Sequence, residues 1–242
     1  AAPPRGPRAR APAGGDGLVS IALQAVAATP VALGVIPIGT GNDCARMLDI
    51  PLSDPVAAAE VIAAGRIRVI DAGRIQYHGD TTWFATVVAS GFDSLVNDRA
   101  NRMRWPRGRR RYDIAMALEA AKLRPLPFRI ELDDQVIDTD VTLVAVGNGT
   151  SYGGGMRICP GAILDDGLLD ITVVAAGGRL RLLRLSPTVY KGTHVDLPEV
   201  STFRSRRVRL SAADITAYAD GDPVAPLPVD IDVVPGALSV FA

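Results

Sequence analysis

The chain has 242 residues, 26 basic and 26 acidic side chains, two cysteines and 48% hydrophobic residues. This length and apolar content are enough for one large domain or two smaller ones with buried cores. The zero net charge provides no overall field that would attract nucleic acid. Two cysteines are too few for a disulfide framework or a cysteine metal site, so a reduced, cytosolic setting is the default. We also expect no membrane-spanning helix and no signal peptide.

The first part of the chain is poor in signals for regular structure. Residues 1–13 are rich in proline and arginine, which predicts a disordered tail. The turn Gly14-Gly15-Asp16-Gly17 follows, and no strand is predicted before it. Because a phosphate-binding turn normally follows a strand, and because the first residue is Ala, we interpret the sequence as a fragment or as one with a misplaced start.

Two glycine turns enclose the first predicted βα unit. Gly14–Gly17 leads into a predicted helix (18–28), and Gly39-Thr40-Gly41-Asn42-Asp43 connects a predicted strand (31–36) to a predicted helix (43–48). Glycines allow backbone N–H groups to approach an anion closely, and the start of a helix adds positive charge. The pair of turns favours phosphate binding. The alternative is that Asn42 and Asp43 only cap a helix and the glycines only turn the chain.

The pattern changes from α/β to mostly β at about residue 67. Before it, Asp54-Pro55 predicts the cap and first position of a helix over 56–64, which Gly65 ends. After it, short strands alternate with turns rich in Gly, Asp and Pro, and one helix is predicted at 112–123. This indicates a partial α/β domain (14–66) and a β domain (67–242) whose last residues pack back on the first. The predicted strands are 67–75, 82–90, 128–132, 141–147, 168–174, 208–210, 215–219 and 229–234.

Two acidic turns in the β domain could carry chemistry. Asp165 and Asp166 follow the glycine-rich block that starts at Gly147, and they could supply oxygen ligands for Mg²⁺ or Ca²⁺. Asp220 and Asp222 flank a glycine after a predicted strand, where one carboxylate could act as a general base. The alternatives are an Asp-Gly hairpin turn for the first pair and a solvated turn for the second.

Taken together and in this order, these motifs resemble the diacylglycerol kinase catalytic family, which includes bacterial lipid kinases and sphingosine kinases. The resemblance covers nearly everything after residue 13. It rests on GGDG (14–17), PIGTGNDCAR (37–46), GNGTSYGGGMRICPGAILDDGLLD (147–170) and DGD (220–222).

The resemblance implies an incomplete N-terminal α/β nucleotide-binding domain followed by a C-terminal β-sandwich. It implies ATP and Mg²⁺ as cofactors and a lipid hydroxyl as the phosphate acceptor. It places a structural Mg²⁺ on Asp166 and on the carbonyls of Ile163 and Leu168. The catalytic base falls on Asp222, with Asp220 beside it. The residues expected to bind ATP are Gly14, Gly15, Asp16, Gly17, Gly39, Thr40, Gly41, Asn42 and Asp43.

Three features depart from the family pattern. Leu18 stands where the family has Thr after GGDG, which removes a phosphate-binding hydroxyl. Asp222 stands where the family has Glu, and a misplacement of 1 Å can lower a rate about 100-fold. The family's first βα units are missing before Gly14. An inactive, truncated relative that binds lipid or a partner is therefore one alternative, and a kinase for a soluble substrate such as NAD is another.

Seven arginines lie between Arg99 and Arg111, together with Trp105. A basic segment with an aromatic side chain suits an anionic membrane surface, so we expect a cytoplasmic protein that associates peripherally with membranes. The alternatives are a nucleic-acid site, which the neutral net charge disfavours, and local salt bridges with Asp93, Asp98 and Asp113. A homodimer is left open. Cys44, which could form a stabilised thiolate, is interpreted as a packing residue, and His78 and His194 as surface or structural residues.

Overall fold

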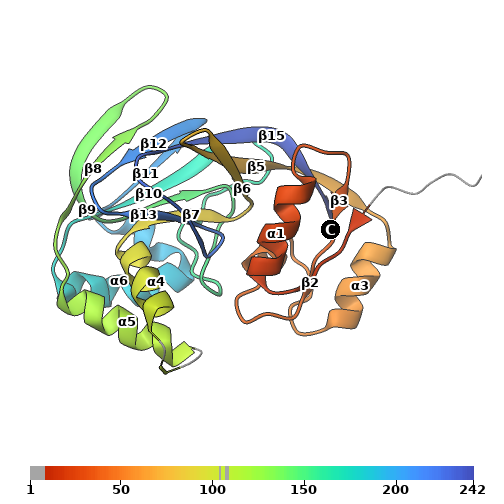
Figure 1. The fold of residues 1–242 in the computed structure, drawn as a ribbon, viewed down its shortest axis with the longest axis horizontal. Helices are drawn as coiled ribbons and strands as arrows, with labels where there is room; N and C mark the ends of the chain where they lie inside the picture. Colours follow the sequence, from red (N-terminus) through yellow and green to blue (C-terminus); the bar gives the residue numbers. More distant parts are fainter. Residues whose placement is uncertain (1–8, 104, 107–108) are drawn as a thin grey trace, which may run out of the picture.

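The structure is a computed structural model that describes residues 9–103, 105–106 and 109–242. It consists of a small α/β part formed by the N-terminal elements and a β-sandwich formed by the rest, as the sequence predicted (Figure 1). In Figure 1 the N-terminal elements lie at one end of the molecule, and a group of helices lies along one side of the sandwich.

The α/β part is built from short strands in parallel pairs. The strand expected over 31–36 is wrong as a single element: it is two short strands, because Ala32–Leu33 pairs with Ala9–Arg10 whereas Ile36–Pro37 pairs with Ala13–Gly14. The helix at 55–63 begins as predicted, since the Asp54 carboxylate accepts hydrogen bonds from Val56 N and Ala57 N. The elements are β1 (Ala9–Arg10), β2 (Ala13–Gly14), α1 (Asp16–Val26), β3 (Ala32–Leu33), β4 (Ile36–Pro37), α2 (Asp43–Met47) and α3 (Pro55–Ala63).

The prediction of a disordered tail is wrong for residues 9–13, and the prediction that no strand precedes Gly14 is wrong too. Both β1 and β2 lie in this stretch. Proline lacks an N–H but keeps its carbonyl, and Pro12 O accepts a hydrogen bond from Ile36 N at 3.1 Å. Arg10 O accepts one from Gly34 N at 2.8 Å. Pairing through carbonyls therefore lets a proline-containing segment form sheet edges. Residues 1–8 of the expected tail lie outside the described part of the chain.

The sandwich strands are mostly antiparallel. The end of the last strand also pairs in parallel with β3, at Val240 and Leu33, so it joins the sandwich sheet to the α/β part. The strands are β5 (Ile67–Tyr77), β6 (Asp80–Phe84), β7 (Val87–Gly91), β8 (Leu126–Glu131), β9 (Val136–Gly147), β10 (Leu169–Ala175), β11 (Val200–Ser205), β12 (Arg207–Ser211), β13 (Thr216–Ala219), β14 (Asp222–Pro226) and β15 (Val229–Phe241).

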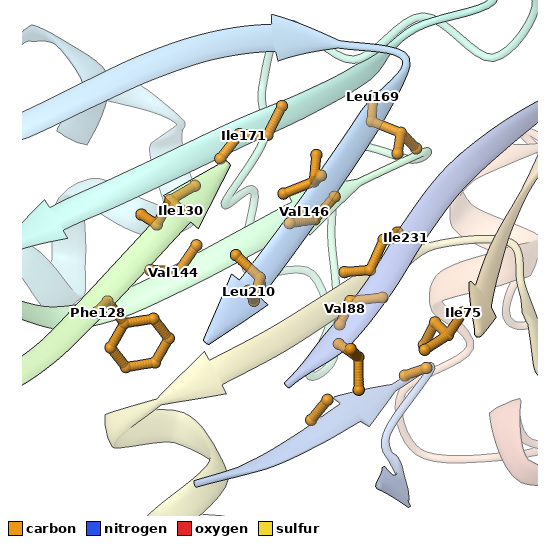
Figure 2. Close-up of a cluster of buried hydrophobic side chains, with 14 of the residues drawn as sticks. Ile75, Val88, Phe128, Ile130, Val144, Val146, Leu169, Ile171, Leu210 and Ile231 are labelled. Carbon is orange, nitrogen blue, oxygen red and sulfur yellow. The ribbon is translucent and has the colours of Figure 1, made fainter. Parts of the chain in front are cut away.

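Figure 2 shows the apolar core between the sandwich layers, where side chains from many strands meet. Phe84, Ile130 and Ile171 in this core have no exposed surface. Burial of such side chains contributes about 25 cal/mol for each Å² of apolar surface removed from water. A second core, under α1 and α2, includes Leu238 and Val240 of β15. The last strand therefore contributes to the cores of both parts.

The strand expected over 82–90 is wrong as a single element, because it is interrupted at Ala85 and Thr86. The backbone N–H groups of these two residues donate to the carboxylate of Asp220, at 2.9 Å each. An acceptor from a distant part of the chain thus replaces the strand neighbour. Sequence periodicity has no access to such a contact.

Three helices pack beside the sandwich, where the sequence predicted one: α4 (Phe92–Arg102), α5 (Arg109–Ala121) and α6 (Arg179–Lys191) (Figure 1). Only α5 was expected. Helix α4 begins at Gly91 without a side-chain cap, and α6 contains Pro187, which normally argues against a helix. A short 3₁₀ helix, Thr193–Asp196, follows α6. None of the helices in the described part of the chain is long and apolar enough to cross a membrane.

Candidate active site

The two predicted glycine turns lie directly against each other. Because β2 and β4 are parallel neighbours, their carboxyl ends carry both turns to the same edge of the sheet, which is where ligands bind in open α/β sheets. A Cβ placed on Gly39 would lie 2.4 Å from Gly15 Cα. Only glycine allows this approach, so a side chain at Gly39 would separate the turns.

Asp16 of the first turn occupies the start of α2. Its Oδ1 accepts hydrogen bonds from Asp43 N at 2.7 Å and from Cys44 N at 3.4 Å. Its Oδ2 would be 2.5 Å from a Cβ on Gly41. The carboxylate thus replaces the anion that the sequence placed at this helix start, so a bound phosphate has to use other donors.

Asn42 fixes the shape of the second turn and leaves Thr40 exposed. Asn42 has left-handed backbone geometry, with φ of 55°. Its side chain accepts from Gly39 N at 2.9 Å and donates to Gly39 O at 2.8 Å. Thr40 lies between these anchored residues, at the exposed tip of the turn.

Asp43 connects the α/β part to the glycine-rich block of the sandwich. Its carboxylate accepts hydrogen bonds from Gly154 N at 2.7 Å and from Gly155 N at 2.8 Å. Burial raises the pKa of Asp43, the two amide hydrogen bonds lower it, and the nearby Asp16 raises it. Gly154 and Gly155 have φ of 83° and 102°, so the block can point both N–H groups at one carboxylate.

Arg46 is a cation at the same place that the sequence analysis did not select. Its Nη2 donates to Gly41 O at 3.2 Å, and its Nε lies 3.9 Å from an oxygen of Asp43. Nε is buried and has no hydrogen-bond partner among the described residues. Its place in the motif, one helical turn after Asn42, is the signal that could have identified it.

The carboxylate of Asp222 approaches the first glycine turn from the sandwich. A Cβ on Gly17 would lie 3.9 Å from Asp222 Oδ2. Burial of part of the side chain raises the pKa of Asp222, and the nearby charge of Asp16 raises it further. We call the group formed by residues 14–17, 39–46, 153–155 and 220–222 the glycine junction.

Asp220 has a different position from Asp222. Its carboxylate accepts from Ala85 N, Thr86 N and the hydroxyl of Thr86. Burial raises the pKa of Asp220, and these three hydrogen bonds lower it. Because both oxygens are engaged by the chain itself, Asp220 fixes the turn that presents Asp222.

The residues predicted to hold a structural Mg²⁺ do not fit that ion as they lie here. Asp166 Oδ1 accepts a hydrogen bond from Leu168 N at 3.1 Å, and Asp166 Oδ2 pairs with the guanidinium of Arg204. A cation at Asp166 would have to replace a guanidinium. Ile163 is 49% exposed. No group of three or more acidic, histidine or cysteine side chains arranged for a metal occurs in the described part of the chain.

Both cysteines and His194 are buried, whereas His78 is exposed. Cys44 and Cys159 are buried, and burial raises the pKa of both thiols, that of Cys159 to about 12. His194 is fully buried and its Nε2 lies 3.0 Å from Ile158 O. Burial lowers the pKa of His194. His78 occupies a turn with φ of 47°.

Family models match both parts of the chain. The diacylglycerol kinase catalytic domain matches residues 11–75, and the YegS C-terminal NAD kinase beta sandwich-like domain matches residues 86–242. The chain therefore belongs to the diacylglycerol kinase family of lipid kinases, as the motifs predicted.

Relatives by sequence agree with this assignment. A protein named diacylglycerol kinase from Mycobacterium tuberculosis is 56% identical over 230 residues, which cover 94% of this chain and 74% of that protein. A protein of Stenotrophomonas maltophilia named as a YegS-like lipid kinase is 31% identical, over 93% of this chain and 75% of its own.

Solved structures share the fold. A crystal structure of a diacylglycerol kinase from Bacillus anthracis matches with a TM-score of 0.69 and 20% identity, over 96% of this chain and 75% of that one. A crystal structure of an NAD kinase from Archaeoglobus fulgidus in complex with ATP matches with a TM-score of 0.54 and 11% identity, over 98% of this chain and 82% of that one.

Proposed function

We propose that this lipid kinase transfers the γ-phosphate of ATP to a hydroxyl of diacylglycerol or a related lipid at the glycine junction. The observation that carries the proposal is the approach of Asp222 to Gly17, next to both glycine turns. Phosphoryl transfer requires alignment and charge neutralisation more than covalent help from the protein. The junction brings together backbone turns, a cation and a carboxylate whose pKa is raised.

Each part of the junction has a role in this mechanism. The Arg46 Nε–H, which is buried and unpartnered among the described residues, fits a phosphate oxygen, and the exposed hydroxyl of Thr40 fits a second one. Asp222 accepts the proton of the lipid hydroxyl, and its raised pKa strengthens it as a base near neutral pH. Asp16 and Asp222 form no ion pair with a described Arg or Lys. Magnesium bound with ATP would supply positive charge next to these two carboxylates.

The direct test is transfer of label from γ-labelled ATP to a panel of lipids, with NAD as a soluble acceptor in parallel. We expect labelled product in the lipid extract, with diacylglycerol among the accepted lipids. Label on NAD alone would instead support the NAD kinase-like alternative, whose basis is a similar fold. No label on any acceptor, with vesicle binding retained, would support the inactive lipid-binding module.

Arg46 provides a test of the ATP site. We expect Arg46→Ala to weaken ATP binding about 10-fold or more, because a charge-assisted hydrogen bond contributes roughly 1.5–3 kcal/mol. Isothermal titration with a non-hydrolysable ATP analogue measures this. Arg129→Ala is the control, since Arg129 is also partly exposed but pairs with Glu131 and Asp138 on the sandwich. Equal affinity for both variants would remove Arg46 from the ATP site.

We further propose that the protein docks on anionic membranes through the helical side formed by α4, α5 and α6 (Figure 1). Trp105 is 80% exposed, and Leu118 and Met116 of α5 are also exposed. Helix α6 extends the basic segment beyond the residues identified from sequence, since Arg181 and Arg184 are exposed. Arg104 and Arg107 of that segment lie outside the described residues.

The helical side also contacts residues that lie next to the glycine junction in the sequence. The Tyr152 hydroxyl, in the glycine-rich block, donates to the carboxylate of Asp93 in α4. The Tyr218 hydroxyl, two residues before Asp220, donates to Asp98 in the same helix. These two aspartates were candidates for local salt bridges with arginines; among the described residues each of them accepts from a tyrosine, and Arg99 pairs with Glu119. A membrane on this side would place lipid headgroups near the catalytic turn.

Flotation with vesicles tests the docking proposal. We expect binding to vesicles that contain phosphatidylglycerol and little binding to neutral phosphatidylcholine vesicles. Replacing Arg181 and Arg184 together by Ala should weaken binding about 30-fold, since each well-placed charge contributes roughly 1 kcal/mol. The matched control is the Arg207→Ala/Arg209→Ala double variant on β12. Equal binding to both vesicle types would rule out the docking surface. The inference that a docked membrane places lipid headgroups near residues 220–222 would then fail too.

A further inference from the structure

The loop between the glycine-rich block and β10 (residues 163–168) carries two carboxylates, and each of them pairs with an arginine. Asp165 pairs with Arg68 at 2.9 Å. Asp166 pairs with Arg204, and the Nε of the same Arg204 lies 3.4 Å from an oxygen of Asp170. One guanidinium therefore bridges the loop to the first strand after it. This bridge occupies the carboxylate to which the family resemblance assigned a structural Mg²⁺.

Strand pairing brings Arg204 to this place. Arg204 of β11 is the direct cross-strand partner of Asp170 in β10, and such neighbours have Cβ atoms about 5 Å apart. The side chain of Arg204 is 44% exposed, whereas those of Asp166 and Asp170 are 22% and 15% exposed. The guanidinium thus covers two less exposed carboxylates from the solvent side.

The other side of the loop is held by Asp71, which is 3% exposed. Its carboxylate accepts from Gly167 N at 2.7 Å and from Gly236 N at 2.8 Å. Its own N–H donates to Leu164 O at 2.7 Å. Hydrogen bonds from the chain therefore fix the loop on one side and Arg204 fixes it on the other.

We propose that the guanidinium of Arg204 holds this loop in place of a divalent cation, so that the native loop requires no metal. A planar guanidinium presents several N–H donors in a fixed geometry and stays charged at every physiological pH. Mg²⁺ at Asp166 would have to displace it, and two positive groups would then compete for the same oxygens. This role of Arg204 does not depend on which lipid is phosphorylated.

Thermal unfolding of the wild-type protein without nucleotide tests this directly. We expect the same Tm in EDTA as in excess MgCl₂. A rise in Tm with Mg²⁺ that disappears in Asp166→Asn would overturn the proposal, because the ion would then bind at Asp166. A rise in Tm that persists in Asp166→Asn would come from Mg²⁺ at another site. It would agree with the proposal that Asp166 binds Arg204 and not a metal ion.

Removing the guanidinium should create the metal dependence that the native loop lacks. We expect Arg204→Ala to lower the Tm by roughly 2–4 °C in EDTA, and Mg²⁺ to restore part of this loss because Asp166 and Asp170 then lack their cation. Arg209→Ala is the matched control: Arg209 is equally exposed, at 44%, and pairs with no described acidic residue other than Asp230. Its Tm should not respond to Mg²⁺.

The same response to Mg²⁺ in the Arg204→Ala and Arg209→Ala variants would contradict the role of Arg204. Should Arg204→Ala fail to fold, Arg204→Lys keeps the charge and loses the planar donor pair. Its Tm should lie below that of the wild type and should stay independent of Mg²⁺. If the Tm of Arg204→Lys rises with Mg²⁺, the result contradicts the proposal.

Discussion

Replacement of Asp222 by Asn is expected to lower kcat/KM for lipid phosphorylation by roughly 10²–10⁴, the contribution typical of a general base. Asp222 is the carboxylate that approaches the first glycine turn, with its Oδ2 3.9 Å from the position of a Cβ on Gly17. The side chain is exposed and forms no ion pair with a described residue, so the fold should be unaffected. Initial rates with γ-labelled ATP and diacylglycerol vesicles measure the loss.

Two comparison variants sharpen this prediction. Asp222→Glu keeps a carboxylate at the junction and should lose much less activity than Asp222→Asn. Asp214→Asn changes an exposed aspartate in the turn before β13, which like Asn can adopt φ of 56°, and should retain wild-type rates. Wild-type activity in Asp222→Asn would exclude Asp222 as the base. The approach of Asp222 to Gly17 would then no longer support the proposed function.

The pH dependence follows from the direction of the pKa shift. A base must be deprotonated, and burial and Asp16 raise the pKa of Asp222. The rate of the wild-type enzyme should therefore rise with pH through a value above that of an ordinary aspartate. Asp16→Asn removes one cause of the shift while keeping an oxygen that can accept from Asp43 N, so this rise should move to lower pH.

The second large effect is on stability, at Asp220. We expect Asp220→Asn to lower the free energy of unfolding by about 2–4 kcal/mol, because the amide NH₂ would face the N–H donors of Ala85 or Thr86. Urea unfolding followed by circular dichroism measures this change. Asp222→Asn is a matched control two residues away that removes no such hydrogen bond and should change stability by less than about 0.5 kcal/mol.

The pH dependence of stability shows whether burial, which raises the pKa of Asp220, outweighs the hydrogen bonds from Ala85 and Thr86, which lower it. Burial raises its folded-state pKa above the ordinary value of 3.8, so the folded protein binds the proton more tightly than the unfolded chain does. Asp220 therefore favours folding most at pH below 3.8, and this contribution decreases as the pH rises through the folded-state pKa. The difference in unfolding free energy between wild type and Asp220→Asn should therefore decrease as the pH rises from 3.8 through the folded-state pKa. An unchanged difference would contradict the raised pKa.

Local signals in the sequence predicted much of the fold correctly. Asp54-Pro55 predicted the start of α3, because a side-chain cap and a proline with fixed φ act within one turn of the chain. Glycine turns after apolar stretches predicted where the chain bends. Alternating apolar residues predicted most sandwich strands, although β11, β14, α4 and α6 were missed. β11 pairs with β10 across the intervening helix α6, a contact that lies far away in the sequence. β14 forms a local hairpin with β13, but it contains Pro223 and Pro226, which argue against a strand.

The residues of the candidate site also fall into two groups, those that the sequence identified and those that only the structure identified. Motif spacing selected the turns at 14–17 and 39–43 and the two aspartates at 220 and 222, because glycine and carboxylate are the residue types that phosphate transfer requires. Spacing gave no means of separating the role of Asp220 from that of Asp222. It also did not select Arg46 or Asp71, whose surroundings come from other segments.

The sequence by itself determined the family, the change from α/β to β structure and the residue types available for catalysis, since these depend on composition and on contacts within a few residues. Only the tertiary structure decided which carboxylates the chain already uses. Asp16 accepts from the start of α2, Asp220 from Ala85 and Thr86, and Asp166 from Arg204. A carboxylate's partners across a fold depend on long-range packing, and of these four carboxylates only that of Asp222 forms no hydrogen bond or ion pair with a described residue.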